Sequence, residues 1–519
     1  MRRRTFFGAF AATATVPGLA AGSRTQQQLT PSFVVDAPGL EEVVTGPDGR
    51  YAFGAGGDQL LVVDCDTVDD PRVVVQAEPT LDGDAMGGIG DAAIDGDRVL
   101  VAGPTGLAEG DPPDGAALFD VSDPANPRQV ASVATDHYVH NAGLSGETAY
   151  LTGSSLADQP LIAYDLSRDA ATEQFRWSVV DEIPAWERVN RGVRQVHDVT
   201  VRGSYAYVSN WDAGTWILDV GDASDPTAVA QIGGVDPSRY SGMSRKEVFA
   251  ELGQLPGNAH NTALSEDGTL LAVGREAGDR NAGDGRYGGP GGVELYDVSD
   301  RSNPEQLAAP RPPVVEDSDG EQSVGTAHNC HFRGDRLYAS WYSSGVRVYD
   351  VGDPTEPETL GWWAAPDQAS FWAAAPLDEG FVGASYQDPS ASEEERRYGK
   401  NAKLYTFPEP DASGAVPAET FEVDATGVPQ NRPVYDFRQT RTTTTSTTAA
   451  TTQDVPTVQR STTTTSATTE PTGTPTTTGT QPPTTGDGSG GSGGSTPGFG
   501  VGAAVAGVTL AALHRLRDD

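Results

Sequence analysis

Residues 215–226, TWILDVGDASDP, contain the pattern that decides the fold. An apolar, β-rich run ends in Asp and Pro, which is typical of a strand that runs into a turn. Four strong copies and two weaker ones share this arrangement: LLVVDCDTVDDP from Leu60, AALFDVSDPANP from Ala116, VELYDVSDRSNP from Val293, VRVYDVGDPTEP from Val346, LIAYDLSRDA from Leu161 and AKLYTFPEP from Ala402. Seven copies of one unit predict a repeat architecture.

A hairpin precedes each copy. Two strands around a Gly-containing turn are visible in VHDVTVRGSYAYVSN (196–210), AHNTALSEDGTLLAV (259–273) and AHNCHFRGDRLYASW (327–341). Another short apolar run, such as 229–232, follows each copy. Four strands in each of seven units predict an all-β protein, a seven-bladed β-propeller over residues 30–410.

The two ends of this body predict how the ring closes. The last unit lacks an outer strand after Tyr405, whereas the apolar run Ser32–Val35 precedes the first unit. We expect this N-terminal strand to complete the last blade, because an unclosed ring would leave an exposed strand edge.

The repeated phrase resembles the LVIVD-repeat family of propellers, found on many archaeal and bacterial surfaces. The resemblance extends over essentially the whole body. It implies a scaffold and says little about activity. The repeated Asp residues could also suggest calcium, but Asp at a strand-to-turn junction usually caps its own backbone, which is the role we expect for Asp219, Asp225, Asp297 and Asp350.

The composition is strongly acidic. The 519 residues include 73 Asp and Glu against 35 Lys and Arg, which gives a net charge of −38, and the only lysines are Lys246, Lys400 and Lys403. Negative charges in such excess repel one another, and salt screens this repulsion. We therefore expect a halophilic protein. Nucleic acid is excluded as a partner because no basic patch is visible. Cys65 and Cys330, the only cysteines, lie in different repeats and are expected to be structural thiols rather than a disulfide framework.

The N-terminus predicts export. Arg2, Arg3 and Arg4 precede an apolar stretch that ends in small residues at Leu19-Ala20-Ala21, as in a secretory signal. The Arg3-Arg4-x-Phe6-Phe7 core resembles a twin-arginine motif, which implies export of a folded protein. We therefore assign residues 1–22 to a signal peptide and expect the mature protein at the extracellular face of the envelope.

The C-terminus predicts a tether in three parts. After a linker over 411–439, residues 440–496 are rich in Thr, Pro, Gly and Ser and are expected to form a disordered, extended stalk. Residues 497–519 contain Pro-Gly-Phe, a short apolar segment and a basic end, and resemble the PGF-CTERM sorting signal of archaeal surface proteins. That resemblance implies cleavage by an archaeosortase and attachment to a lipid. A short C-terminal membrane helix is the alternative, although the apolar run 500–513 is below the usual length of about 20 residues.

Four histidines recur at one position of consecutive repeats, where the innermost strand of each blade opens. They are His140, His197, His260 and His328, and each is followed by a polar residue, namely Asn141, Asp198, Asn261 and Asn329. Because innermost strands surround the channel, the four imidazoles should converge at its mouth. Neutral imidazole is a common ligand of transition metals, so Zn, Fe or Cu is the predicted cofactor.

The remaining blades offer Glu41, Asp91 and Trp372 near this position, which would leave one side of the site open to a ligand. His137 and His331 are secondary candidates. Two interpretations of the recurrent histidines stay open: a metal or ligand site, and a ring of His side chains that only pack or cap. The polar residues after them could orient the imidazoles or join strand ends.

The long insertions point to the same face. They lie between blades or between the second and third strands of a blade, which open on one side of a propeller: 103–115, 179–195, 233–258, 275–292 and 311–326. Trp186, Trp211, Trp341 and Trp372 lie in or near this face and could line it.

Three functions fit these patterns. The favoured one is a surface-anchored, monomeric propeller that binds an unidentified ligand or cell-surface partner through its long-loop face, with a metal at the channel mouth. The second is a metal-dependent enzyme of redox or oxygenase type at the four-His site, a layout similar in form to that of carotenoid-cleaving oxygenases. The third is a structural protein of the envelope. No nucleophile elbow, phosphate loop or metalloprotease helix is present, so an enzyme is the less favoured class.

Overall fold

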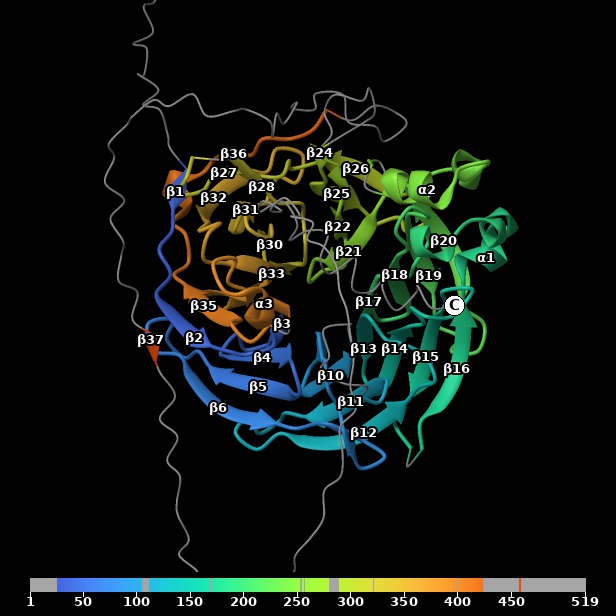
Figure 1. Cartoon of the computed structure of the whole chain (residues 1–519), viewed down its shortest axis with the longest axis horizontal. Helices are drawn as coiled ribbons and strands as arrows, with labels where there is room; N and C mark the ends of the chain where they lie inside the picture. Colours follow the sequence, from blue (N-terminus) through green and yellow to red (C-terminus); the bar gives the residue numbers. More distant parts are fainter. Residues whose placement is uncertain are drawn as a thin grey trace, which may run out of the picture.

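The protein is an all-β, seven-bladed propeller. The computed structural model describes residues 26–104, 112–168, 170–252, 254–255, 257–279, 289–320, 322–397, 399–422 and 457–458. In Figure 1 the blades surround a common axis, and the chain passes around the ring once. The seven-bladed fold predicted from the repeats is confirmed. The predicted signal peptide and sorting tail, and the stalk apart from 457–458, lie outside the described residues.

Each blade is a four-stranded antiparallel sheet whose strands follow one another from the axis outward. Blades 1 to 3 comprise β3 (Leu40–Thr45), β4 (Tyr51–Gly56), β5 (Gln59–Asp64) and β6 (Arg72–Ala77); β9 (Asp91–Asp95), β10 (Arg98–Gly103), β11 (Gly115–Asp120) and β12 (Arg128–Ala134); and β13 (Ala142–Ser145), β14 (Thr148–Thr152), β15 (Leu161–Asp165) and β16 (Thr172–Trp177).

Blades 4 to 6 repeat this order. They comprise β17 (Asp198–Arg202), β18 (Tyr205–Ser209), β19 (Thr215–Asp219) and β20 (Thr227–Ile232); β21 (Ala259–Leu264), β22 (Leu270–Arg275), β25 (Val293–Asp297) and β26 (Glu305–Ala308); and β29 (Cys330–Arg333), β30 (Arg336–Ser340), β31 (Val346–Asp350) and β32 (Glu358–Trp363). Two short strands extend blade 6, because β1 (Gln27–Gln28) and β36 (Val416–Pro417) both pair with β32.

Blade 7 is built from both ends of the body. Its first three strands are β33 (Ser370–Leu377), β34 (Gly380–Gln387) and β35 (Lys403–Phe407), and its fourth is β2 (Phe33–Asp36). β2 pairs antiparallel with β35, with Val34 opposite Tyr405 and Val35 opposite Leu404. The predicted closure by the N-terminal strand is therefore confirmed. The two-residue strand β37 (Thr457–Val458) pairs parallel with β2 on the outside.

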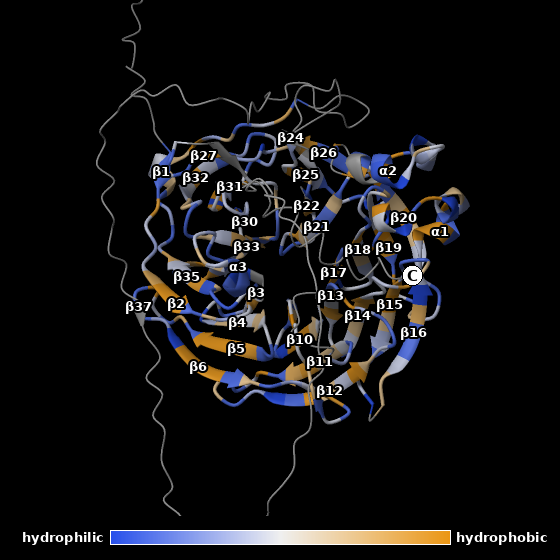
Figure 2. Ribbon diagram, viewed as in Figure 1, coloured by the Kyte–Doolittle hydropathy of each residue, from blue (hydrophilic) through white to orange (hydrophobic). Residues whose placement is uncertain are grey.

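The repeated apolar phrase forms the third strand of each blade, and its two faces fill two different cores. In β19, Trp216 and Leu218 belong to the core between blades 3 and 4, whereas Ile217 packs between blades 4 and 5. Successive side chains of a strand point to opposite faces. A strand buried on both faces therefore reads as a continuous apolar run, and Figure 2 shows this hydrophobic character along β5.

The turn after this strand is capped by its own Asp. The side-chain oxygen of Asp219 accepts a hydrogen bond from the Gly221 N–H (2.9 Å), and Asp297 and Asp350 accept equivalent bonds from the second residue after each of them. The expected local capping role is confirmed for these three residues.

The long insertions contain most of the helical structure. Between blades 3 and 4 lie α1 (Val179–Glu182), η1 (Pro184–Arg188) and η2 (Arg191–Val193), and between blades 4 and 5 lie η3 (Pro237–Tyr240) and α2 (Arg245–Leu252). Smaller elements occupy other connections: β7 (Thr80–Leu81), β8 (Asp84–Ala85), β23 (Gly278–Asp279), β24 (Gly289–Pro290), β27 (Val314–Glu316), β28 (Gln322–Val324), α3 (Glu393–Arg397) and η4 (Ala412–Gly414). No helix of the described ranges combines the length and apolar character that crossing a membrane requires.

We predict that Phe33→Ala weakens the propeller by about 3 kcal/mol, because it leaves a cavity in the core that joins blade 7 to blade 1. Urea unfolding of the purified variant measures this loss. Val73→Ala, on the outer strand of blade 1 where Val73 is 44% exposed, is the matched control and should change stability by less than about 0.5 kcal/mol. Equal losses in the two variants would contradict the closing role of β2.

Candidate metal centre

The four recurrent histidines form a row at the inner ends of blades 3 to 6. Their ring centroids follow one another at 4.4 Å from His140 to His197, 4.0 Å from His197 to His260 and 4.4 Å from His260 to His328. Each side chain is at least 94% buried. The structure thus brings together all four residues that the sequence places at equivalent positions of consecutive blades.

Backbone carbonyls determine which nitrogen of two of these rings carries the proton. Nδ1 of His197 lies 3.2 Å from the carbonyl oxygen of His260, and Nδ1 of His328 lies 2.6 Å from that of Trp372. A carbonyl only accepts, so both Nδ1 atoms donate and both Nε2 atoms keep a free electron pair. Nε2 of His197 lies 2.9 Å from Nε2 of His140, and Nε2 of His328 has no hydrogen-bond partner among the described residues.

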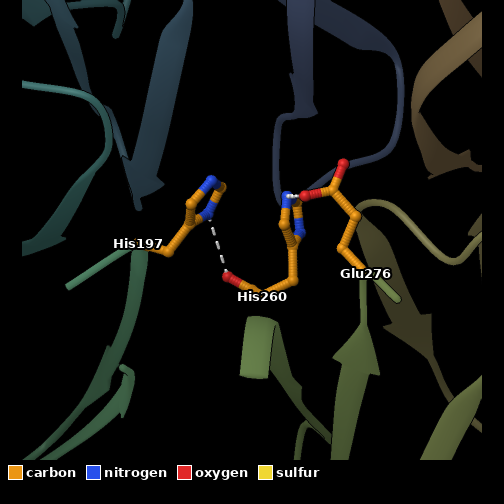
Figure 3. A group of neighbouring side chains, drawn as sticks. All are labelled: His197, His260 and Glu276. Carbon is orange, nitrogen blue, oxygen red and sulfur yellow. Dashed lines mark hydrogen bonds and ion pairs between the residues drawn. The ribbon is translucent and has the colours of Figure 1, made fainter. Parts of the chain in front are cut away.

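A carboxylate completes the centre (Figure 3). Oε2 of Glu276 lies 3.3 Å from Nε2 of His260, and the Tyr342 hydroxyl donates a hydrogen bond to Oε1 of the same carboxylate. The ligand atoms offered by His197, His260 and Glu276 all lie within 4.8 Å of one another. Nδ1 of His260 is buried without a partner in the part of the chain that the structure describes.

Glu276 was not predicted from the sequence, yet it occupies a repeat position. Ser209, Gly274 and Ser340 each pair with the first residue of the third strand in blades 4, 5 and 6. Trp211, Glu276 and Tyr342 lie two residues after them. Superposing the repeats on the ends of their second strands would have identified this second site-forming position.

Aromatic rings flank the histidine row. Trp211 lies 5.1 Å from His197 between ring centroids, while Trp372 and Tyr342 lie 4.3 Å and 4.8 Å from His328. Of the tryptophans predicted to line this face, Trp211 and Trp372 contact the row. The other two do not: Trp186 packs on Tyr240 in the loop cluster, and Trp341 belongs to the core between blades 5 and 6.

Burial keeps the four imidazoles neutral. It lowers the pKa of His140 to about 4 and that of His328 to about 3. The pKa values of His197 and His260 fall well below the usual value, first through burial and then through the neighbouring histidines. Neutral imidazole is the form that binds a metal ion. Burial also raises the pKa of Glu276 to about 7, although the hydrogen bond from Tyr342 opposes that shift.

The polar residues that follow the histidines join different blades. Asp198 accepts a hydrogen bond from the Thr262 N–H (2.9 Å) in the next blade and is also bonded by the Asn141 side chain. The Asn329 amide donates to Glu42 of blade 1. These contacts fix the strands that carry the histidines, so their effect on the imidazoles is indirect.

Asn261 acts in the same way between blades 5 and 6. Its amide satisfies both neighbouring backbone groups when the nitrogen donates to the His328 carbonyl (3.0 Å) and the oxygen accepts from the Cys330 N–H (3.2 Å). The backbone of His328 is thereby tied to the preceding blade.

The secondary candidates lie outside the row. Nδ1 of His331 donates to the Ala374 carbonyl (2.9 Å), and Nδ1 of His137 lies 3.3 Å from the Tyr138 carbonyl. Asp91 accepts from the Ala142 N–H (2.6 Å) and thus joins blade 2 to blade 3 as Asp198 joins blade 4 to blade 5. Glu41 is buried at the start of β3.

Comparison with known proteins supports the repeat. Residues 193–236 match the LVIVD repeat. The chain carries an LVIVD repeat. No curated protein matches it.

Two solved structures are similar in fold. The β-propeller domain of Cps50 (Swd1) from Myceliophteria thermophila is 11% identical, with a TM-score of 0.44, and the match covers 73% of this chain and 99% of that one. A protein of unknown function from Desulfotomaculum acetoxidans is 14% identical, with a TM-score of 0.42, and the match covers 62% of this chain and 84% of that one.

We predict that Asp91→Asn stabilises the propeller more at pH 8 than at pH 5. Burial, followed by the charge of Asp198, raises the pKa of Asp91 to about 8. When the pKa of an acid is higher in the folded protein than in the unfolded one, the folded state is favoured below the unfolded pKa. This stabilisation is lost as the pH rises toward the folded pKa. Asn keeps the accepting oxygen for the Ala142 N–H and removes this dependence, which we expect to amount to about 1–4 kcal/mol.

Urea unfolding at both pH values measures the effect. Asp95→Asn is the matched control, because Asp95 accepts from the Gly146 N–H of the next blade (2.7 Å) but is exposed. A pH dependence of the Asp91→Asn effect no larger than that of the control would contradict the prediction.

Proposed function

We propose that this chain is an exported, envelope-anchored propeller that binds one transition-metal ion at the histidine row. His197, His260 and Glu276 are its ligands, and His140 and His328 lie on either side of them. The observation that carries the proposal is the buried group of three donor atoms within 4.8 Å, two of them on imidazoles that burial keeps neutral.

The spacing of the donors supports a shared ion. Atoms bound to one ion at about 2.1 Å lie about 3–4 Å apart, depending on the angle between the bonds. The separation of 3.3 Å between Nε2 of His260 and Oε2 of Glu276 agrees with this range, and the donor atoms of the group all lie within 4.8 Å of one another.

The donor types favour a particular class of metal. Imidazole with one carboxylate suits Zn, Fe or Cu, whereas Ca and Mg select sites made of oxygen atoms alone. Three protein ligands leave a coordination position open for a small molecule. A metal held at the long-loop face therefore explains how a scaffold of this kind binds a ligand.

Unpartnered nitrogen atoms argue against a row of histidines that only pack. A buried polar atom without a hydrogen bond costs about 1–3 kcal/mol. Nδ1 of His260 and Nε2 of His328 are both buried without a partner among the described residues. Packing alone leaves that cost in place, whereas a small molecule bound beside the ion would give these two nitrogens hydrogen-bond partners.

Metal analysis of the mature protein purified in high salt tests the proposal. We expect about one equivalent of Zn, Fe or Cu per chain, and a loss of affinity of about 100-fold or more in a His197→Ala, His260→Ala variant. His331→Ala is the matched control, because His331 is a buried histidine outside the row and its variant should keep the metal. The proposal fails if both variants retain the same metal, or if the native protein binds none after exposure to Zn²⁺, Fe²⁺ and Cu²⁺.

The proposed location rests on the two ends of the sequence. Arg3-Arg4 precedes the N-terminal apolar stretch, and Pro497-Gly498-Phe499 precedes the C-terminal one. We expect Arg3→Lys with Arg4→Lys to block export, and intact mass measurement of the surface protein to show a chain without residues 1–22 and 497–519. A mature C-terminus that still contains Phe499 to Leu513 would contradict processing and favour a short membrane helix.

A further inference from the structure

Glu276 connects the histidine row to a tyrosine. One carboxylate oxygen faces His260, and the other accepts the hydrogen bond of the Tyr342 hydroxyl. The phenol is therefore one carboxyl group away from the proposed metal ion, and its ring lies 4.8 Å from that of His328. A proton acceptor in hydrogen-bond contact is the arrangement that lets a phenol lose its proton in the same step as an electron.

Two further oxidisable rings lie beside Tyr342. Tyr342, Trp372 and Tyr386 form a separate buried cluster, and each is at most 4% exposed. Their centroids lie 5.0 Å apart for Trp372 and Tyr386, 6.1 Å for Tyr342 and Tyr386 and 6.2 Å for Tyr342 and Trp372. A radical formed on Tyr342 would be shielded from solvent and in contact with rings that can share it.

The backbone conformation of Tyr342 is unfavourable for an aromatic residue. Tyr342 has φ +48° and Trp211, at the equivalent position of blade 4, has φ +42°, a region that L-residues rarely adopt. Gly57 of blade 1 has φ +63° and forms an isolated bridge to the next blade, as Trp211 and Tyr342 do. Large rings are thus kept against the histidines at a conformational cost, which is typical of functional positions.

We infer that Tyr342 is a redox-active residue that supplies one electron when a peroxide oxidises the bound metal. This inference rests on the proposed metal site and adds an activity to it, one-electron chemistry on a protein side chain. It applies to iron or copper and not to zinc, because zinc has no accessible second oxidation state.

With hydrogen peroxide as the oxidant, the reaction reduces one peroxide molecule to two water molecules. The O–O bond breaks, and the two oxygen atoms leave as two water molecules after taking up two electrons and two protons. A bound Fe²⁺ or Cu⁺ ion would supply one electron and rise by one oxidation state, and Tyr342 would supply the other and become a neutral phenoxyl radical. The phenolic proton passes to Oε1 of Glu276 and on to the departing oxygen, and the second proton comes from solvent.

Electron paramagnetic resonance of the full mature protein tests this inference. The protein is loaded with Fe²⁺ without oxygen, mixed with one equivalent of hydrogen peroxide and frozen. We expect a radical signal that narrows when tyrosine is ring-deuterated. Tyr342→Phe, loaded to the same iron content, should lose the signal, whereas Tyr349→Phe, a buried tyrosine outside the cluster, should keep it.

Iron content separates the two possible failures. A native protein that binds no iron, copper or zinc refutes the proposed function, whereas one that binds iron and forms no tyrosine radical refutes only this inference. A signal that persists in folded Tyr342→Phe also overturns it. If that variant does not fold, peptide mapping of the peroxide-treated native protein decides the question, because oxidation must then be found at Tyr342, Trp372 or Tyr386 and absent from Tyr349.

Discussion

The pairing of β2 with β35 is the constraint on which the rest of the structure depends. It joins the two ends of a body of nearly 400 residues in one sheet. A ring closed in this way has no free first or last blade, so each blade packs against two neighbours. The inner ends of blades 3 to 6 then have fixed positions around the axis, and only this makes four residues far apart in the sequence into one row.

A second set of contacts holds the innermost strands in register. Asp91, Asp198 and Asn261 each reach across to backbone groups of the following blade. Burying a carboxylate at such a place opposes its ionisation, as the raised pKa of Asp91 and Asp198 shows. The cost of burying these carboxyl groups is offset because the same contacts fix where the innermost strands start. A shift of one residue at the start of these strands would turn each histidine away from its neighbours.

The fold and the four histidines of the site could be predicted from the sequence, whereas Glu276 was not predicted. The third strand of each blade is buried on both faces, so each blade has the same apolar phrase in its sequence. The number of blades and the closing strand could therefore be predicted. The four histidines were predictable for the same reason, since one repeat position means one place in space. Glu276 was missed because its equivalents, Trp211 and Tyr342, share its position and not its chemistry.

Other properties of the site could not be predicted from residue types. The protonated nitrogen of His328 depends on a carbonyl of Trp372 in the next blade, and the low pKa of each imidazole depends on how completely the surrounding blades exclude water. Both are consequences of packing between segments far apart in the sequence. Only the position of the histidines is encoded locally.

The local costs at the histidine row support a functional interpretation of it. Two large aromatic residues adopt positive φ angles, two imidazole nitrogens are buried without partners among the described residues, and a carboxyl group is held where burial raises its pKa. Each lowers the stability of the protein, and the closed ring of seven blades is rigid enough to tolerate them. A bound ion would offset the charge of the carboxylate, and a small molecule on that ion would give the two nitrogens hydrogen-bond partners. The aromatic residues would gain nothing from the ion itself, so their strain indicates chemistry beyond holding it.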